Sequence, residues 1–373
     1  MTVVFAGGGT GGHLYPAIAI ADALRGRNAR IAFVGTADRL EASIVPKAGY
    51  ELHTIASRQL RRRPSLDTLA TVGANIKGTL QSLKLLAAAR PDLIVATGGY
   101  VCFPLALAAR IRRMLRLSRA PIVLLEPNAA PGLTNRLLAP IVDEIWGGLA
   151  GDAGRLPPKY RQTGIPIRSS LRNLPARDAA LARFGLDLSR QTLVAMGGSQ
   201  GARTINDALL AAVADGGIPD GWQLLMVTGE GEYARVRAAL QANPATSMPV
   251  RAVPYLDDMA DAYASADLLV ARAGASTLGE LAALGKPAIL VPYPYAAEGH
   301  QALNAARFAS AGAAVVATDR EIEAGGFAAL LAQTATPQRL AGLTGGARRL
   351  QRGDALEEIL ARIDVLVPRK SRP

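Results

Sequence analysis

Three short apolar runs of this sequence each end in a glycine-rich turn, and this repeated pattern restricts the fold more than any other feature. The turns are residues 7–12, 97–100 and 197–202. The first turn leads into an apolar helical pattern from Pro16 to Leu24. Glycine permits positive φ and a close approach of backbone N–H groups to a ligand, and a helix start adds partial positive charge. The pattern therefore predicts that phosphate or sugar binds where the strands end.

The first turn is followed directly by His13. An imidazole can take up or release a proton near neutral pH, so His13 is a candidate base. Two alternatives stay open: a tight turn that binds nothing, and a histidine that only caps or packs. The spacing differs from G-x-G-x-x-G, and no acidic residue after the second strand is clearly placed to bind a ribose. We therefore predict no dinucleotide and no other cofactor. His53 lies in an ordinary strand pattern and is expected to be structural.

Apolar strands alternate with helical patterns along the whole chain, which is typical of parallel α/β sheets. We expect strands at residues 2–6, 31–34, 51–55, 93–96, 121–125, 144–146, 192–196, 223–228, 249–253, 267–270, 288–291 and 314–317. We expect helices at residues 16–25, 39–48, 65–89, 103–116, 202–214, 231–240, 257–264, 276–284, 301–310 and 337–349. The predicted fold is α/β, with two Rossmann-like parallel-sheet domains facing a cleft.

A length of 373 residues suits two domains. A break at residues 156–158, followed by Gly164-Ile165-Pro166, indicates a first domain at residues 1–165 and a second at 166–350. Residues 354–365 have helical periodicity, and we expect residues 351–373 to form a helix that packs back on the first domain, with a frayed tail.

The N-terminal sequence, the length of the apolar runs and the cysteine content together predict the cellular compartment of the chain. The N-terminus runs into a strand without a basic leader, and no apolar run approaches about 20 residues, so we expect neither a signal peptide nor a membrane span. Cys102 is the single cysteine, which excludes an internal disulfide and a cysteine metal cluster and fits a reducing cytoplasm.

The net charge of +12 is confined to the first half of the chain. Through Arg168 there are 22 lysines and arginines against 10 aspartates and glutamates, whereas the remaining residues hold 20 of each. A bias in one domain predicts a surface that faces anions.

Two basic segments contribute to this excess. Residues 58–63 hold four arginines, and residues 110–119 hold five among apolar residues. A helical apolar stripe of Ile76, Leu80, Leu83 and Leu86 lies between them. These segments are either solvated faces over a normal core or a patch that meets an anionic membrane surface. We expect no nucleic acid partner, because no recognition motif accompanies the charge.

Residues 271–280 form a further candidate anion site, because small residues and glycine leave N–H groups open at a helix start near Ser276 and Thr277. Glu280 lies one turn into that helix. Its carboxylate can accept two hydrogen bonds from a ribose diol, although an acid is also favoured there by the helix dipole.

His300 and Gln301 follow a predicted strand, where they could bind sugar hydroxyls or only cap the next helix. Asp257-Asp258 is read as a helix start. No metal-ligand cluster and no D-x-D pattern is found, so we predict no metal, with helix dipoles and cationic side chains stabilising negative charge instead.

Taken in order, five segments resemble the MurG family, the N-acetylglucosaminyltransferases of peptidoglycan synthesis within the GT-B superfamily. They are residues 8–13 (GGTGGH), 97–101 (TGGYV), Asn128 with 132–135 (GLTN), 197–202 (GGSQGA) and 272–280 (RAGASTLGE). Single segments recur in other sugar transferases, but the ordered set is specific.

The resemblance implies inverting transfer of GlcNAc from UDP-GlcNAc to the 4-hydroxyl of the muramoyl sugar of undecaprenyl-diphosphate-linked MurNAc-pentapeptide, with His13 as general base. The implied binding residues are Thr10, Gly11 and Gly12 for the acceptor diphosphate, Tyr100 and Asn128 for the acceptor and donor-sugar region, Arg168 and Ser199 for the donor phosphates, the Leu256 backbone for uracil, Glu280 for ribose, and Gln301 for GlcNAc. The helix start at Ala275, Ser276 and Thr277, and His300, stay candidates on the residue patterns given above. The implied location is peripheral, at the cytoplasmic face of the cell membrane, where partners can include other cell-wall enzymes.

Three segments depart from the family pattern. Leu125 stands where a histidine usually precedes Glu126, Cys102-Phe103 replaces small residues, and His300 replaces a glutamine. Two other functions stay open. One is a related GT-B transferase with another lipid or aglycone acceptor. The other is a UDP-sugar-binding or epimerase-like protein that needs no lipid acceptor.

Overall fold

The computed structural model of the chain divides into two compact units. The first comprises Met1–Arg168 together with Arg352–Pro373, and the second comprises Ser169–Gln351. The structure describes residues 1–59, 67–149, 158–198, 200–243, 248–350 and 353–368. Within those ranges, no helix combines the length and the apolar character that crossing a bilayer requires.

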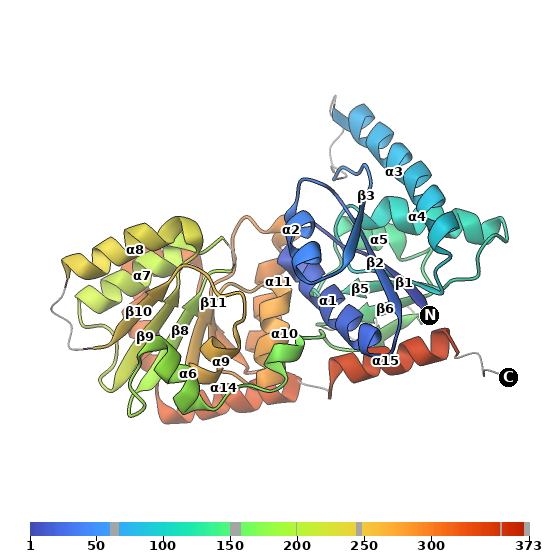
Figure 1. Ribbon diagram of the computed structural model, residues 1–373. Helices are drawn as coiled ribbons and strands as arrows, with labels where there is room; N and C mark the ends of the chain where they lie inside the picture. Colours follow the sequence, from blue (N-terminus) through green and yellow to red (C-terminus); the bar gives the residue numbers. More distant parts are fainter. Residues whose placement is uncertain (60–66, 150–157, 199, 244–247, 351–352, 369–373) are drawn as a thin grey trace. The chain divides into compact units, whose positions relative to one another are not determined.

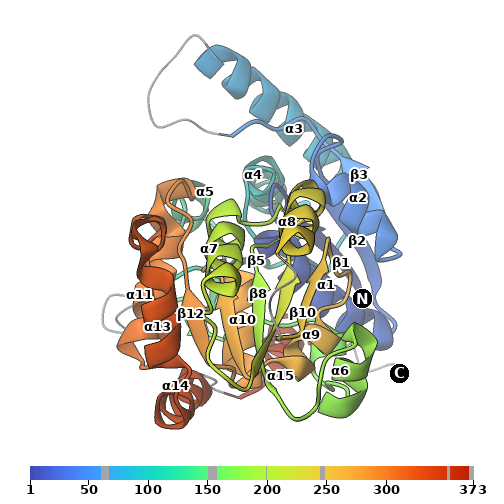
Figure 2. The ribbon, with the colours of Figure 1, turned by 90° about the vertical axis from the view of Figure 1, so that its left-hand side faces the viewer.

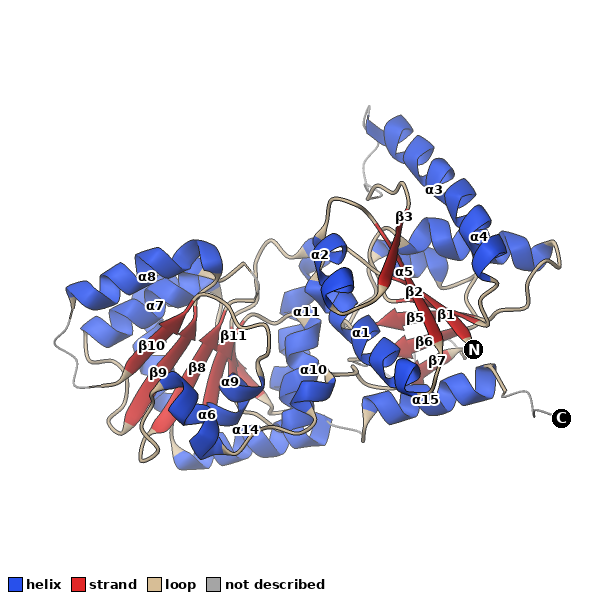
Figure 3. Cartoon of the chain, viewed as in Figure 1, coloured by secondary structure: helices blue, strands red, loops and turns tan. Residues whose placement is uncertain are grey.

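The first unit is built on a seven-stranded sheet in which every pairing is parallel (Figures 1 and 3). Its strand order is β3-β2-β1-β4-β5-β6-β7. The strands are β1 (Thr2–Ala6), β2 (Arg30–Gly35), β3 (Glu51–Thr54), β4 (Leu93–Ala96), β5 (Ile122–Glu126), β6 (Glu144–Gly147) and β7 (Tyr160–Gln162).

Helices cover both faces of this sheet, which is why its central strands are apolar along their whole length. The helices are α1 (Gly11–Gly26), α2 (Leu40–Lys47), α3 (Asp67–Ala89), α4 (Cys102–Met114), α5 (Leu133–Leu138) and α15 (Ala355–Leu366). Successive residues of β1 point to opposite faces. Val3 and Phe5 pack with α1 and α15, whereas Val4 and Ala6 pack with α3 and α4.

The second unit contains a six-stranded, all-parallel sheet with the order β10-β9-β8-β11-β12-β13 (Figure 2). Its strands are β8 (Gln191–Met196), β9 (Trp222–Val227), β10 (Val250–Val253), β11 (Leu268–Ala271), β12 (Ala288–Leu290) and β13 (Ala314–Val316). Its helices are α6 (Arg177–Phe184), α7 (Arg203–Ala214), α8 (Glu230–Ala242), α9 (Ala260–Ser265), α10 (Ala275–Leu284), α11 (His300–Ser310), α12 (Asp319–Glu321), α13 (Phe327–Thr334) and α14 (Pro337–Leu350).

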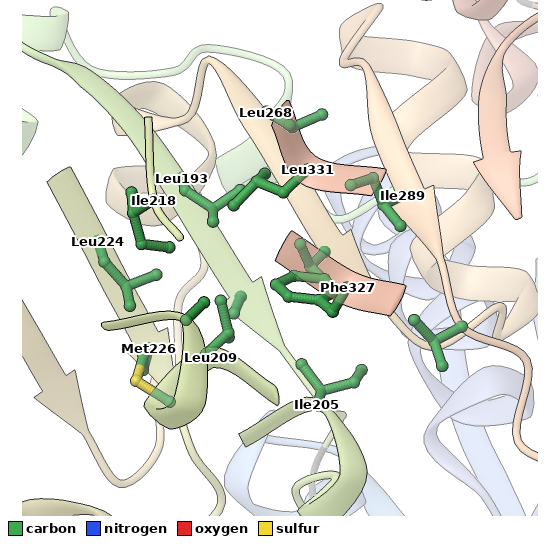
Figure 4. Packing of buried hydrophobic residues seen from close by; sticks show 14 of the residues in the cluster. Leu193, Ile205, Leu209, Ile218, Leu224, Met226, Leu268, Ile289, Phe327 and Leu331 are labelled. Carbon is green, nitrogen blue, oxygen red and sulfur yellow. The ribbon is translucent and has the colours of Figure 1, made fainter. Parts of the chain in front are cut away.

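Figure 4 shows the core of this unit, where Leu193 and Leu268 of the sheet pack with Leu209 of α7 and with Phe327 and Leu331 of α13. All five side chains are almost entirely removed from water. Burial on this scale fixes the sheet on which the loops of the second unit are mounted.

The prediction of two parallel-sheet α/β units is confirmed, and each expected strand overlaps an observed one. The first helix begins earlier than the sequence predicts: α1 starts at Gly11, not at residue 16. Glycines are weak helix formers, so the pattern alone missed its first turn. The helix expected at 257–264 begins only at Ala260, because the Asp258 carboxylate accepts the Ala260 N–H (3.0 Å) and ends the preceding loop.

Candidate active site

The glycine turns of both units lie where the strand order of each sheet reverses. In the first sheet, β2 and β3 lie on one side of β1, and β4 lies on its other side. In the second sheet, β9 and β10 lie on one side of β8, and β11 lies on its other side. Ligands of open parallel sheets bind outside the carboxyl ends of the strands at such switch points. Each unit therefore presents two predicted loops at the position that its topology favours for ligand binding.

The first loop joins β1 to α1 and leaves the start of that helix open. Gly9 adopts a left-handed conformation (φ 85°), which glycine tolerates best. Thr10, the N-cap residue, makes no side-chain hydrogen bond to the helix. The first-turn N–H groups at Gly11 and Gly12 can therefore serve an anionic ligand.

The second loop, after β4, holds the His13 ring in place. The Nδ1 atom of His13 lies 2.9 Å from the Thr97 carbonyl oxygen. A carbonyl can only accept, so Nδ1 carries the hydrogen and Nε2 keeps the lone pair of the neutral ring. Gly98 has φ 110°, and a Cβ added there would overlap the ring. The loop thus sets both the tautomer and the position of the imidazole.

Cys102 lies beneath the same turn, where its thiol contacts the Gly98 backbone and the Ala6 carbonyl. Burial raises the pKa of this thiol to about 12, so it stays protonated. The departure at this position therefore has a structural explanation. Tyr100, half-buried, places its hydroxyl 3.5 Å from the Thr36 hydroxyl of the neighbouring β2–α2 loop.

Glu126, at the end of β5, organises the loop that carries Asn128. Four N–H groups donate to its buried carboxylate: the Asn128 backbone (3.0 Å) and side chain (3.0 Å), the Gly132 backbone (3.3 Å) and the Asn135 side chain (2.6 Å). Burial raises the pKa of Glu126, and these donors oppose the rise without cancelling it. Both carboxylate oxygens are therefore committed to the loop, which makes Glu126 a poor candidate for a base.

Arg168 ends the first unit, and its guanidinium lies over the Tyr15 ring, 4.9 Å from the centroid. The same ring packs against Gly11, where a Cβ would lie 2.9 Å from it. The cation is therefore held beside the first glycine loop by a cation–π contact.

The third loop, after β8, is closely packed against its neighbour. A Cβ at Gly201 would overlap the Thr228 carbonyl, and Gly201 has φ 76°, so only glycine fits there. Ser199, which the sequence predicts as a phosphate contact, lies outside the described residues.

The fourth loop presents the start of α10, at Ala275, which has Gly274 as its N-cap residue and no capping side chain. The Ser276 Oγ atom is buried and has no hydrogen-bond partner in the described part of the chain. Buried hydroxyl groups in folded proteins almost always have a hydrogen-bond partner. The Ser276 hydroxyl and the N–H groups of residues 275–277 together form a site of the kind that binds phosphate.

Glu280 is nearly buried, and it accepts a 2.6 Å hydrogen bond from the Tyr263 hydroxyl. Tyr263 belongs to α9, which follows the loop that contains Leu256. The hydrogen bond between Tyr263 and Glu280 therefore joins the helix that follows the predicted uracil-binding loop to the acid that is predicted to bind ribose. Sequence reasoning did not single out Tyr263, because one tyrosine in a short helix carries no pattern.

His300 and Gln301 begin α11. The Gln301 side-chain oxygen accepts the Tyr293 N–H (2.9 Å), which leaves its NH₂ end as the group that could meet a sugar hydroxyl. His300 Nε2 lies 3.8 Å from a Glu298 carboxylate oxygen. Both contacts go to residues that precede α11, whose N-cap residue is Gly299 and whose start has no capping side-chain hydrogen bond, so neither shows the capping role that the sequence left open.

The arginine of the 272–280 segment has a structural partner. Arg272 forms an ion pair with Asp319 (2.5 Å) and donates to the Val291 carbonyl, so it ties β11, β12 and α12 together. Within the described ranges, no group of three or more histidine, cysteine, aspartate or glutamate side chains could hold a metal ion.

Comparisons with known proteins identify the class. The model of the glycosyltransferase family 28 N-terminal domain matches residues 3–146, and that of the glycosyltransferase family 28 C-terminal domain matches residues 192–341. The two matches follow the two units and include all four loops. The chain is a glycosyltransferase and belongs to family 28.

Its relatives specify the branch. A protein of Desulforudis audaxviator (strain MP104C), named UDP-N-acetylglucosamine–N-acetylmuramyl-(pentapeptide) pyrophosphoryl-undecaprenol N-acetylglucosamine transferase, is 38% identical over the full length of both chains. A protein of the same name from Carboxydothermus hydrogenoformans (strain ATCC BAA-161 / DSM 6008 / Z-2901) is 37% identical, covering 100% of this chain and 99% of its own. Crystalline MurG of Acinetobacter baumannii shares the fold, with a TM-score of 0.76, 24% identity, and coverage of 98% of this chain and 99% of its own. The chain belongs to the MurG family.

Proposed function

We propose that this chain transfers GlcNAc from UDP-GlcNAc to the 4-hydroxyl of the muramoyl sugar of undecaprenyl-diphosphate-linked MurNAc-pentapeptide, with inversion at the anomeric carbon. The observation that carries the proposal is the imidazole of His13, fixed by the Thr97 carbonyl beside the open start of α1. A base next to an anion-binding helix start suits an acceptor that has both a hydroxyl and a diphosphate.

In the acceptor half of the reaction, the N–H groups of Gly11 and Gly12 bind the lipid-linked diphosphate. His13 Nε2 takes the proton of the sugar hydroxyl as that oxygen attacks the anomeric carbon of GlcNAc. Tyr100 and the Asn128 loop line the acceptor. The carbon–oxygen bond to UDP breaks as the new glycosidic bond forms.

In the donor half, the start of α10 and the Ser276 hydroxyl hold the diphosphate of UDP-GlcNAc, and Glu280 accepts from the ribose diol. The helix dipole stabilises the charge that appears on the departing UDP, a role that a bound metal ion can also serve. Turnover is therefore expected to survive an excess of chelator. Complete loss with EDTA, restored by magnesium, would contradict this part.

The first unit also carries a surface suited to a membrane. Leu69, Val72, Ile76 and Leu80, called the α3 stripe, repeat at helical spacing and are exposed, Leu69 by 81%. Leu83 and Leu86 instead turn to the core, so only part of the predicted stripe faces water.

The α3 stripe lies on a helix that packs against α4 (Figure 1). Met114 and Leu115, at the end of α4, are exposed beside Arg112 and Arg116. Arg113 is paired with Asp143 (2.5 Å), and residues 61–63 lie outside the described ranges. Exposed apolar and cationic groups together support peripheral binding to the anionic cytoplasmic face of the cell membrane.

The test is a transfer assay on the purified chain with UDP-GlcNAc and a lipid-linked muramoyl-pentapeptide. We expect the disaccharide product and free UDP, formed only when both substrates are present. UDP release with a different lipid or aglycone acceptor alone would favour a related transferase. Conversion of the UDP-sugar without any acceptor would favour the epimerase-like alternative.

A further inference from the structure

A buried carboxylate lies directly beneath the first glycine loop. Glu41, in the first turn of α2, is fully inaccessible to water. One of its oxygens accepts from the Thr36 N–H (3.0 Å) and the Thr36 hydroxyl (2.7 Å), and the other accepts from the Gly9 N–H (3.0 Å). In the part of the chain that the structure describes, no ion pair includes Glu41.

The surrounding backbone is shaped to admit this carboxylate. A Cβ at Gly8 would lie 2.5 Å from its Oε1 atom, and a Cβ at Gly35 would lie 2.6 Å from its Cγ atom. Glycine at both positions therefore removes the side chains that would exclude Glu41. The loop and the acid therefore fit each other closely.

A buried charge without a cation is costly, so hydrogen bonds to the charged form must hold it there. Of these bonds, the one from Gly9 is long-range, because it joins the first glycine loop to the start of α2, 32 positions further along the chain. It turns the Gly9 N–H inward and holds that residue at φ 85°. The N–H groups left for a ligand are then those at the start of α1.

We propose that Glu41 is a positioning residue, which fixes the loop of residues 7–12 so that the start of α1 and the His13 ring are aligned before the acceptor binds. It also reaches the second loop, because Thr36 contacts the Tyr100 hydroxyl (3.5 Å). The identity of the ligand as the acceptor diphosphate rests on the proposed function, but the hold of Glu41 on the loop does not.

The first test variant is Glu41→Gln in the full-length chain. An amide offers one oxygen and one NH₂ group, so either Gly9 or Thr36 faces a donor instead of an acceptor. We expect KM for the lipid-linked acceptor to rise by roughly 10- to 100-fold, the scale of a lost hydrogen bond to a charged group. KM for UDP-GlcNAc is expected to stay within about twofold, because the donor is assigned to the second unit.

A matched control is Glu144→Gln. Glu144 is also a buried carboxylate of the first unit. It is the first residue of β6, so it lies at the amino ends of the parallel strands, whereas the glycine loops follow their carboxyl ends. We expect it to lower stability without raising KM for the acceptor. A rise of similar size in both variants would reduce Glu41 to a general contributor to stability.

Hydrogen exchange provides a readout independent of activity. The amide exchange of a peptide that covers residues 7–13 is expected to accelerate in Glu41→Gln and to stay unchanged in Glu144→Gln. Unchanged exchange and unchanged acceptor KM would overturn the proposal. If the unaltered chain transfers no sugar, the proposed function fails, and the exchange rates still decide whether Glu41 holds the loop.

A second variant, Glu41→Asp, covers the case in which the glutamine variant does not fold. Aspartate keeps the charge, but its shorter side chain cannot reach Thr36 and Gly9 together. We expect it to fold and to show faster loop exchange together with a raised KM for the acceptor. Normal values of both quantities in this variant would contradict the proposed role.

Discussion

The Nδ1 atom of His13 lies 2.9 Å from the carbonyl oxygen of Thr97, so the first helix of the chain is joined to the loop after β4 through the imidazole itself. The contact spans 84 positions in sequence and two adjacent strands of the sheet. It leaves Nε2 as the basic atom and makes the loop after β4 part of the proposed catalytic apparatus.

Gly98→Ala is expected to reduce kcat by about 100-fold, because a small displacement of a catalytic group has effects of this size. The new Cβ would overlap the His13 ring, and alanine is strained at φ 110°. UDP affinity should not change. Gly73→Ala is the control, since no atom lies within 4 Å of a Cβ there and α3 favours alanine. Steady-state kinetics give kcat for both variants. Equal kcat values for Gly98→Ala and Gly73→Ala would mean that catalysis tolerates a displaced His13 ring.

Glu280→Ala is expected to weaken UDP binding by about 1.5–3 kcal/mol, the range for hydrogen bonds to a charged group. Tyr263→Phe should weaken it by about 1 kcal/mol, because the carboxylate loses the donor that orients it. With 2′,3′-dideoxy-UDP both losses should disappear in calorimetry. Tyr50→Phe, which removes a hydroxyl bonded to Asp22 in the first unit, is the control. Equal losses with both nucleotides would assign Glu280 a structural role only.

Peripheral membrane binding is expected to depend on the α3 stripe and on the cations at the end of α4. Charge reversal at Arg112 and Arg116 should weaken sedimentation with anionic vesicles by roughly fivefold per residue, and added salt should act in the same direction. Ile76→Ser with Leu80→Ser should weaken it further. Leu188→Ser, at a similarly exposed leucine of the second unit, should have no effect. Binding indifferent to salt and to all of these changes would mark the surface as an ordinary solvated face.

The ion pair between Glu144 and Arg362 should make the stability of the first unit depend on pH. Burial raises the pKa of Glu144, but hydrogen bonds from Arg362 and Trp146 outweigh it and leave the pKa below its ordinary value. A carboxylate with a lowered pKa stabilises the folded state above the unfolded pKa, near 4.3, and this contribution is lost as pH falls below that value.

Removal of one partner tests this ion pair. Arg362→Ala should cost about 2–3 kcal/mol at pH 7, below the roughly 3–5 kcal/mol of a fully buried pair, because Arg362 is partly exposed. The difference from the unaltered chain should shrink at pH 3.5 in urea unfolding. A difference that is the same at both pH values would show that lost packing of α15, not the charge, is responsible.

The strand pattern was predictable because buried parallel strands need continuous apolar runs, and the observed strands coincide with them. Five short elements, β7, α5, α6, α12 and α13, escaped prediction, since three to eight residues carry too little periodicity. The loops were found through their glycines. What the sequence could not supply is the pairing of Gly9 with Glu41 and of Tyr263 with Glu280, because hydrogen bonds between residues of different elements leave no spacing to read.

The strongest test of the mechanism is the removal of the base. A sugar hydroxyl is a weak nucleophile and must lose its proton as the new bond forms, so His13→Ala is expected to lower kcat by about 10²–10⁴-fold. The Michaelis constant for UDP-GlcNAc should change little, because the donor is assigned to the second unit. The acidic limb of the pH–rate profile should disappear, since protonation of Nε2 is the event that it reports.

Glu126 cannot readily replace the imidazole, because four N–H groups already occupy its carboxylate. Glu126→Gln should therefore disturb acceptor binding through the Asn128 loop and keep the acidic limb, whereas His13→Ala should lose it. The two variants thus separate proton transfer from loop positioning. A His13→Ala enzyme with near-normal kcat and an unchanged pH profile would reduce His13 to a packing residue and require another base for the first unit.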